Sequence, residues 1–312
     1  MNQRDVVLGL LGDRGPMPYI PAAFFIHFPA EFHAGQAAVA KHLEYYRFTG
    51  MDMAKIQYEK TFPRNPEIRR PEDWAKMPFY GREFYEDPLA IVAQIVKAKK
   101  SEAVVLQTIY SPFMNAAETV GDELVLRHMR QDPEKVKRGL DVITESTLFF
   151  VRECIKLGVD GFYHSTEGGE ADRLEGPLFT EYVKPSDLMV MKEMNDNTPF
   201  NILHVCDLMG EYRDLATYLD YPGNIVNCPL KTAKQSLTPR EASKLFGRPY
   251  MGGLWRKGAI AGGTPEQIKK EVEAVLQDAP DRFILGADCT VPSETRWENI
   301  RTAIEVAHNY RR

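Results

Sequence analysis

Short apolar stretches alternate with amphipathic stretches along almost the whole chain, and this alternation restricts the possible folds more than any other feature. The apolar stretches have the length and composition of buried β-strands, and the stretches between them carry apolar residues at helical spacing. We predict eight strands, at residues 19–25, 51–58, 103–110, 160–164, 200–206, 225–228, 250–254 and 283–287. Eight strands alternating with helices predict an α/β fold with a closed parallel sheet, the (β/α)8 TIM barrel.

The alternative fold is an open, doubly wound sheet. In its dinucleotide-binding form, this fold has a glycine-rich phosphate-binding turn after the first strand, and no such turn follows residues 19–25. The chain has 312 residues and contains no break in composition, low-complexity tract or recognisable repeat. We therefore expect a single (β/α)8 barrel domain over residues 1–312, with a short helix at its N-terminus.

Composition and charge exclude several classes of function. The net charge is -5, and the chain has no basic run of the kind that binds nucleic acid. No apolar run approaches the roughly 18 residues of a membrane span, and the N-terminus lacks the pattern of a signal peptide. Four cysteines are too few for a disulfide framework and fit a reducing compartment. We expect a cytoplasmic protein that acts on a small-molecule substrate.

Three soft ligands at predicted strand ends form a candidate metal site. His204 and Cys206 are two residues apart, so their side chains point to the same side of a strand, and Cys289 follows the last predicted strand. In a barrel, the carboxyl ends of the strands share one rim, where active sites lie. One imidazole and two thiolates suit Zn²⁺, with a fourth position left for water or a substrate thiol.

Each of these residues also has an ordinary structural explanation. A single cysteine is usually a small core residue, as we expect for Cys154, and a single histidine is usually a hydrogen-bonded core or surface group. Cys228 is a rival ligand, which we rank below Cys289 because a proline and a basic loop follow it. Asp207 and Asp288 either orient His204 from outside the metal site or cap the loops that follow.

Other polar residues at predicted strand ends are candidates for the same rim. His164 and Glu167 are candidate catalytic residues, because either side chain can act as a general acid or base. A barrel mouth also needs groups that position the substrate. The candidate substrate-binding residues are Gln57, Glu59, Gln107, Tyr110, Asn227, Trp255 and Arg256. We expect about half of them to line the pocket and the others to cap loops.

The ligand set favours one kind of chemistry. A zinc ion held by two thiolates and one imidazole is nearly neutral, and it binds a substrate thiol as its fourth ligand. The bound thiol loses its proton readily, while its sulfur stays nucleophilic enough to attack carbon. The candidate site therefore fits methyl transfer to sulfur better than hydrolysis.

Several motifs in their order along the chain resemble those of a known family. They are residues 4–11 (RDVVLGLL), 110–113 (YSPF), 178–185 (LFTEYVKP), 252–254 (GGL), 263–266 (GTPE) and 287–292 (ADCTVP). Together they resemble the uroporphyrinogen decarboxylase superfamily, and within it the zinc-dependent methylcobamide:thiol methyltransferases. The resemblance covers nearly the whole chain and implies a TIM barrel.

The resemblance also separates two branches of the superfamily. The decarboxylases have an arginine-rich stretch after the first strand, whereas residues 23–28 here read AFFIHF. Glu59 stands near the position of the catalytic aspartate of the decarboxylases, and Glu118 stands near that of their active-site tyrosine. Neither decarboxylase residue is therefore present at its expected position in this chain. The methyltransferase branch has a His-x-Cys after the fifth strand and a Cys after the eighth, which match His204, Cys206 and Cys289.

The methyltransferase branch implies bound Zn²⁺ and a methyl group that moves between a thiol and either a corrinoid on a partner protein or a methylated small molecule. The first alternative is a decarboxylase or other lyase of the same superfamily that acts on a small carboxylated substrate, with Glu59 or His164 as its acid. The second alternative is a non-catalytic partner protein that binds a corrinoid or a metal. The sequence leaves the oligomeric state open, with a homodimer as one alternative.

Overall fold

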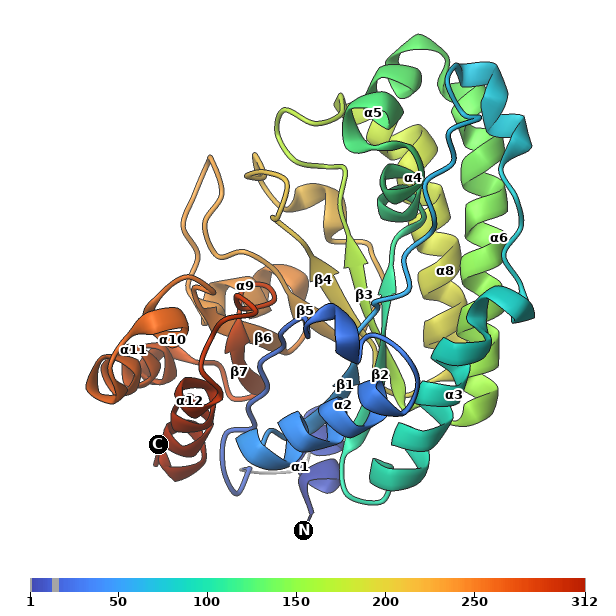
Figure 1. The fold of residues 1–312 in the computed structure, drawn as a ribbon. Coiled ribbons are helices and arrows are strands. Elements are labelled where there is room, and N and C mark those ends of the chain that lie inside the picture. The colour runs from blue at the N-terminus through green and yellow to red at the C-terminus, as the bar shows by residue number, and fades with distance from the viewer. Residues whose placement is uncertain (1, 13–16, 312) are drawn as a thin grey trace.

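A parallel sheet of seven strands forms the centre of the protein in the computed structural model, which describes residues 2–12 and 17–311. The strands follow one another in chain order around the sheet (Figure 1). They are β1 (Met53–Ile56), β2 (Val104–Tyr110), β3 (Gly161–Thr166), β4 (Ile202–Val205), β5 (Ile225–Asn227), β6 (Tyr250–Leu254) and β7 (Phe283–Ala287). This arrangement confirms the predicted α/β barrel fold class.

The prediction of eight regular strands is wrong at residues 19–25. This extended segment makes a single parallel bridge, between Ala22 and Leu285 of β7. On its other side, the Asp52 N–H donates to the Ala22 carbonyl at 3.0 Å. The segment thus lies between β7 and β1 and occupies the eighth place in the ring. It forms no ladder, because Pro18 and Pro21 lack the N–H groups that a strand donates.

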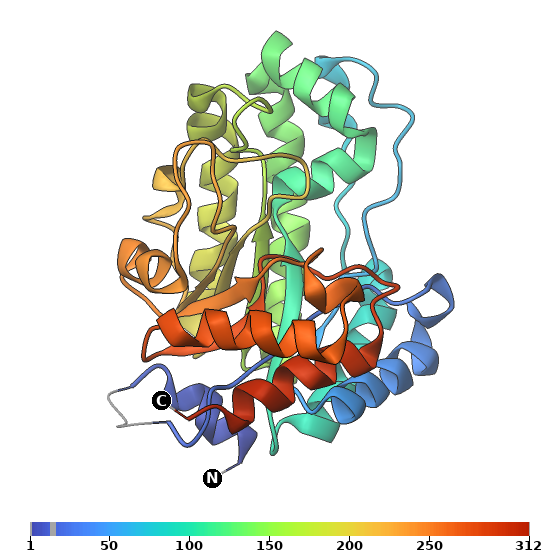
Figure 2. The same cartoon turned by 90° about the vertical axis from the view of Figure 1, so that its left-hand side faces the viewer.

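Helices cover the outer face of the sheet (Figures 1 and 2). They are α1 (Gln3–Gly9), α2 (Gly35–Thr49), α3 (Arg82–Lys99), α4 (Pro112–Val120), α5 (Asp122–Gln131), α6 (Pro133–Leu157), α7 (Gly176–Leu178), α8 (Lys184–Asn197), α9 (Pro239–Phe246), α10 (Ala259–Gly262), α11 (Pro265–Asp278) and α12 (Trp297–Asn309). None of the described helices combines the length and apolar composition needed to cross a membrane.

The helix ends follow local signals in the sequence. Thr264 caps α11 by accepting a hydrogen bond from the Gln267 N–H, and Pro265 takes the first helical position. Gly158 ends α6 with a φ of 90°, a conformation that only glycine adopts without strain. Residues 212–218 have the apolar spacing of a helix, which predicts one there, but this prediction is wrong: the structure forms only the short turn η4 (Ala216–Tyr218).

The short helix α1 closes the amino-terminal end of the barrel. Val6, Val7 and Leu10 are fully buried. The Arg4 guanidinium donates two hydrogen bonds to the Asp160 carboxylate just before β3, at 2.5 and 2.6 Å. A functional site therefore has to lie at the opposite end, where the strands end at their carboxyl termini.

Candidate metal centre

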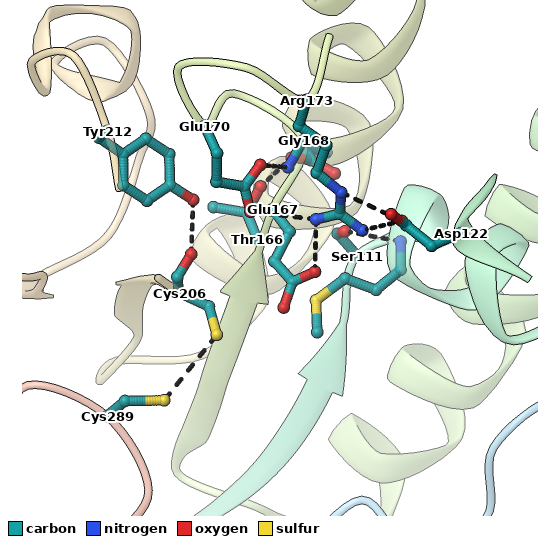
Figure 3. Close-up of polar contacts among 12 residues, drawn as sticks. Ser111, Asp122, Thr166, Glu167, Gly168, Glu170, Arg173, Cys206, Tyr212 and Cys289 are labelled. Carbon is teal, nitrogen blue, oxygen red and sulfur yellow. Dashed lines mark hydrogen bonds and ion pairs between the residues drawn. The ribbon is translucent and has the colours of Figure 1, made fainter. Parts of the chain in front are cut away.

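His204, Cys206 and Cys289 lie together at the carboxyl end of the barrel. The two sulfurs are 3.8 Å apart, and the Cys289 sulfur is 3.4 Å from Nε2 of His204. All three potential ligand atoms lie within 4.8 Å of one another, and no other such group of three occurs among the described residues. Figure 3 shows the two cysteine sulfurs facing each other across the mouth.

The strands bring these residues together for a simple reason. His204 is in register with Ser165 of β3 and Asn227 of β5, so its ring points to the interior of the barrel. Cys206 follows two residues later on the same side, and its N–H donates to the Thr166 carbonyl at 3.0 Å. Cys289 comes from the loop directly after β7, which the curled sheet carries across the interior towards β4.

The distances fit a tetrahedral zinc site. Zn–S bonds of about 2.3 Å in a tetrahedral site place two sulfurs about 3.8 Å apart. The observed sulfur separation of 3.8 Å matches this value and is far too long for a disulfide. His204 and Cys206 are buried and Cys289 is partly exposed, so a fourth position on the open side is accessible to a substrate.

The surroundings favour an ionised thiol at Cys289. The hydrogen bond from Cys206, followed by the charge and hydrogen bond of His204, lowers the pKa of Cys289 well below its ordinary value, although burial opposes this shift. The same sulfur–sulfur hydrogen bond, together with burial, raises the pKa of Cys206. A soft cation next to both sulfurs would favour two thiolates.

Aromatic and polar side chains form a floor beneath the cluster. The Tyr163 ring stacks on the His204 ring with centroids 4.9 Å apart, and its hydroxyl donates to Asn227 at 2.5 Å. Lys55 lies over the Tyr163 ring, 4.7 Å from the ring centroid. Burial lowers the pKa of Lys55 to about 7. The Tyr163 ring, held by Asn227, thus restricts the orientation of the His204 ring.

Asp207 and Asp288 pair with Arg256 and do not contact the His204 ring. The Arg256 Nη1 donates to Asp207 at 2.6 Å and to Asp288 at 3.1 Å. Asp288 also accepts from the backbone N–H groups of Arg256 and Cys289, so it shapes the loop that carries the sulfur. Nδ1 of His204 has no hydrogen-bond partner among the described residues.

Glu167 lies on the other side of the cluster, in a buried ionic network. Arg173 Nη1 donates to Glu167 at 2.7 Å and to Glu170 at 3.0 Å, and Nη2 donates to Asp122 at 2.5 Å. Figure 3 shows the Glu167 carboxylate between Arg173 and the sulfur of Cys206. Burial raises the pKa of Glu167, while the charge of Arg173 and hydrogen bonds from Arg173 and Cys206 oppose the shift.

The structure does not bring His164 to the cluster. Its neighbours Tyr163 and Ser165 point inward, so His164 points to the helical layer outside the sheet, as does Thr166, which contacts Asp187 of α8. Neither ring nitrogen of His164 has a hydrogen-bond partner among the described residues. Burial, followed by the charge of His204, lowers the pKa of His164 to about 3. Here the ring is a neutral core group.

The remaining candidates are divided between the interior, the rim and the outer face of the sheet. Tyr110 is in register with Ser165 and so faces the interior, as does Asn227. Gln57 binds the Ile26 carbonyl there, whereas Gln107, which alternates with the inward Thr108, lies on the outer face of the sheet.

Cys228 is fully buried and lies outside the cluster. Burial raises the pKa of its thiol far above the ordinary value. Its carbonyl accepts a hydrogen bond from the Tyr250 hydroxyl at 2.9 Å, so this residue serves the wall of the barrel.

Trp255 and Arg256 line a cavity of about 710 Å³ next to the cluster. Asp207 and Asp288, each directly beside a cysteine of the cluster, form part of its wall. The exposed side chains of Leu208 and Trp255 make its entrance apolar. A cavity of this size accommodates a small organic molecule.

Two groups at the mouth gave no recognisable sequence signal. One is Arg173, whose partners lie in two separate segments of the chain. The other is His27, whose Nδ1 lies 3.0 and 3.1 Å from the two carboxylate oxygens of Glu59. The sequence predicted Glu59 as a candidate but did not reveal His27 as its partner. The pairs His27–Glu59 and Arg173–Asp122 join distant segments, so no spacing of a known motif identifies them.

Comparison with known proteins places the chain in a family. Residues 47–310 match the family model described as Uroporphyrinogen decarboxylase (URO-D). The uroporphyrinogen decarboxylase of Aquifex aeolicus (strain VF5) is 21% identical over 184 residues, which cover 58% of this chain and 51% of that protein. The match thus spans about half the length of that relative.

Two solved structures have similar folds. A methyltransferase from Methanosarcina mazei is 13% identical with a TM-score of 0.78, and the match covers 98% of each chain. A B12-independent methionine synthase from Shewanella sp. W3-18-1 is 12% identical with a TM-score of 0.53 and covers 93% of this chain and 97% of that one. The family match over residues 47–310 shows that this chain belongs to the uroporphyrinogen decarboxylase family.

Proposed function

We propose that this protein is a zinc-dependent methyltransferase that moves a methyl group to a thiol. The observation that carries the proposal is the group of one imidazole and two thiols whose ligand atoms lie within 4.8 Å of one another at the barrel mouth. Two of the structures with similar folds are named as a methyltransferase and a methionine synthase, which supports the same reaction class.

His204, Cys206 and Cys289 would hold the zinc ion. Bound zinc supplies Lewis acidity that lowers the pKa of a substrate thiol without abolishing the nucleophilicity of its sulfur. The three side chains come from the end of β4 and from the loop directly after β7, and the Tyr163 ring stacks on His204. The site is therefore preorganised, which lowers the cost of bringing the sulfur and the methyl carbon into line.

Glu167 would accept the proton that the substrate thiol loses. It is buried beside Cys206, and Arg173 fixes its orientation through a hydrogen bond of 2.7 Å. Arg173 in turn is anchored by Asp122 at the start of α5. The loop after β3 thus holds the carboxylate at a fixed place next to the sulfur ligands, which a general base requires.

The cavity lined by Trp255 and Arg256 would bind the substrate that carries the methyl group or the thiol. It has a volume of about 710 Å³ and shares its wall with the loop of Cys289 through Asp288. A methyl donor in this cavity, or a corrinoid on a partner protein above the mouth, would reach the sulfur from the open side.

A decarboxylase has less support. Residues 23–28 contain no arginine, and the side chain paired with Glu59 is the histidine at position 27. His164, the other acid considered for that reaction, faces the helical layer. The sulfur ligands would have no role in a decarboxylation that proceeds without a metal.

Zinc content is the direct test of the proposal. We expect Cys206→Ser and Cys289→Ser each to lose zinc and methyl transfer from methylcobalamin to a panel of thiols, because each removes one of three ligands. Elemental analysis of protein purified without a histidine tag measures the metal, and circular dichroism verifies the fold. Cys228→Ser, which changes a buried cysteine outside the cluster, should keep its zinc. Normal zinc in both ligand variants would refute the assignment.

A further inference from the structure

His27 and Glu59 form a second polar pair near the barrel mouth. The two carboxylate oxygens of Glu59 lie 3.0 and 3.1 Å from Nδ1 of His27. The His27 side chain is 39% exposed, whereas that of Glu59 is 10% exposed. No described residue forms a hydrogen bond with Nε2 of His27. A carboxylate that fixes one ring nitrogen leaves the other nitrogen to face a substrate.

The backbone directs the His27 side chain to the inner side of the ring. The Phe25 ring contacts the Tyr163 ring edge-on in the barrel interior, with centroids 5.4 Å apart. His27 lies two residues further along the same extended segment, so it points to the same side, above Phe25. The Val291 N–H donates to the Phe25 carbonyl at 2.9 Å, which joins this segment to the loop that carries Cys289.

The segment that carries His27 lies opposite β4 in the ring of strands. The segment with His27 lies between β7 and β1, and β4 is the strand opposite to it in the ring of eight places. His204 and Cys206 come from β4. Cys289 comes from the loop after β7, on the same side of the ring as His27. An in-line displacement requires the leaving atom on the side of the methyl carbon away from the attacking sulfur, and a donor that extends from the sulfur ligands towards this segment would have that atom next to His27.

The electrostatic environment keeps Glu59 ionised. Burial alone would raise the pKa of Glu59, but the hydrogen bond and charge of His27, together with the charges of His33 and Lys55, hold it below the ordinary value. Charges of Glu59 and of Cys206 both raise the pKa of the Tyr110 hydroxyl, after the larger effect of burial. The charges of Glu59 and of the sulfur cluster thus both act on the Tyr110 hydroxyl.

We propose that His27, oriented by Glu59, is the general acid that protonates the leaving atom of the methyl donor. This inference rests on the proposed function and names the substrate class: a small molecule with its methyl group on nitrogen or oxygen. The sulfur forms a bond to the methyl carbon, and the bond from carbon to nitrogen or oxygen breaks. Its electron pair stays on the leaving atom, which takes the proton from Nε2 of the doubly protonated His27 ring and leaves a neutral ring with its proton on Nδ1 beside Glu59.

The chemistry of the leaving group distinguishes this class from a corrinoid donor. A departing amine nitrogen or alkoxide oxygen is strongly basic and leaves poorly without a proton. A methylcobamide releases its methyl group and keeps the electron pair on cobalt, so it needs no acid. The presence of an oriented, exposed imidazole at the mouth therefore favours the small-molecule donor.

The test compares two kinds of donor with the zinc-loaded full-length protein. Methylcobalamin is one donor, and panels of methylamines and methyl ethers are the others, with the same thiol acceptor. The measured quantity is the ratio of the rate with the amine or ether donor to the rate with methylcobalamin. We expect this ratio to fall at least about 100-fold in His27→Gln, which is the usual loss when a general acid is removed. Separate amine and ether panels identify the leaving atom.

The chain offers a matched control at its opposite end. His308 also pairs with a carboxylate, Asp52, at 2.8 Å, but it lies on α12 at the amino-terminal end of β1. His308→Gln removes the same kind of ring from the same kind of pair, and we expect the ratio of rates to stay unchanged. Glu59→Gln keeps His27 but removes the orienting charge, so it should lower the ratio of rates as His27→Gln does. Because the two variants test the same pair independently, the test still stands if one of them folds poorly.

A measurement without turnover tests the orientation of the ring. Nitrogen-15 shifts of histidine-labelled protein distinguish the two tautomers of a neutral ring, and the signal of His27 is the one that disappears in His27→Gln. We expect the proton on Nδ1 in the wild type and a mixture of tautomers in Glu59→Gln. A proton on Nε2 of neutral His27 would overturn the proposal.

The remaining outcomes separate this inference from the proposed function. An unchanged ratio in His27→Gln, or a wild type that uses methylcobalamin but no amine or ether, would overturn the role of His27 and leave the methyltransferase intact. A wild type that binds no zinc and uses no donor would overturn both.

Discussion

Asp187 is a buried carboxyl group with no cationic partner among the described residues. Its Oδ2 accepts hydrogen bonds from Thr166 at 2.5 Å and Tyr221 at 3.1 Å, while Oδ1 has no partner in the described structure. Burial raises its pKa from 3.8 to about 7, although both hydrogen bonds oppose the shift. The folded state therefore favours the neutral form of the Asp187 carboxyl group over the charged form.

The pH dependence of stability follows from the direction of this shift. Because the folded pKa lies above the unfolded one, the contribution of Asp187 is fully present below pH 3.8 and is lost as the pH rises through about 7. We expect the unfolding free energy of the wild type, minus that of Asp187→Asn, to fall by about 4 kcal/mol from pH 4 to pH 8. Urea denaturation at several pH values measures it. Asp141→Asn, an exposed site on α6, serves as control, and parallel curves for wild type and Asp187→Asn would contradict the prediction.

At the scale of elements, the junction of β3 and β4 depends on one glycine. A Cβ atom at Gly161 would lie 1.6 Å from the Phe200 carbonyl oxygen just before β4. Real side chains cannot approach a backbone atom so closely, so the two strands would have to separate. Because β3 carries Tyr163 beneath His204 and β4 carries His204 itself, such a shift would also reach the candidate metal centre.

We expect Gly161→Ala to lower the unfolding free energy by about 3 kcal/mol or more, the upper range for overpacking in a close-packed core. Gly262→Ala is the matched control, because a Cβ atom there meets nothing within 4 Å. Thermal and urea unfolding of the two variants measure the difference. Equal stability of the two variants would show that β3 and β4 adjust more freely than the structure indicates.

At the scale of the whole molecule, Asp52 joins the beginning and the end of the chain. Its carboxylate accepts hydrogen bonds from the Tyr19 hydroxyl, the Ala22 N–H and the His308 ring, each at 2.8 Å. These groups belong to the extended N-terminal segment and to α12. Both chain ends lie at the same end of the barrel as α1 (Figure 2). One buried carboxylate thus connects the segment between β7 and β1 to the closing helix.

We expect Asp52→Ala to lower the unfolding free energy by about 3 to 5 kcal/mol, because it leaves buried donors without an acceptor. Arg152→Gln is the control, since it breaks only an exposed ion pair with Glu193 and should cost less than about 1 kcal/mol. Urea unfolding measures both. A loss below about 1 kcal/mol for Asp52→Ala would show that barrel closure does not depend on this carboxylate.

Local patterns in the sequence determined most of the elements and the ligand set. The hydrophobic period and the capping residues placed β2 to β7 and most of the helices, because these signals act within a few residues. His204 and Cys206 were predictable as inward neighbours, since alternation along one strand sets their common direction. The segment at residues 19–25 has the same apolar composition, so composition alone predicts a regular strand there. The structure forms only a single bridge, because prolines prevent a regular ladder.

Only the tertiary structure decided which side chains face one another. A shift of a strand by one residue exchanges its inner and outer faces, so the outward direction of His164 depends on pairing with β2 and β4. The pairs Arg173–Asp122 and His27–Glu59 join segments far apart in the chain, and no local spacing encodes them. The sequence by itself therefore determined the strands and the kinds of ligand, whereas long-range pairing decided which polar groups meet at the mouth.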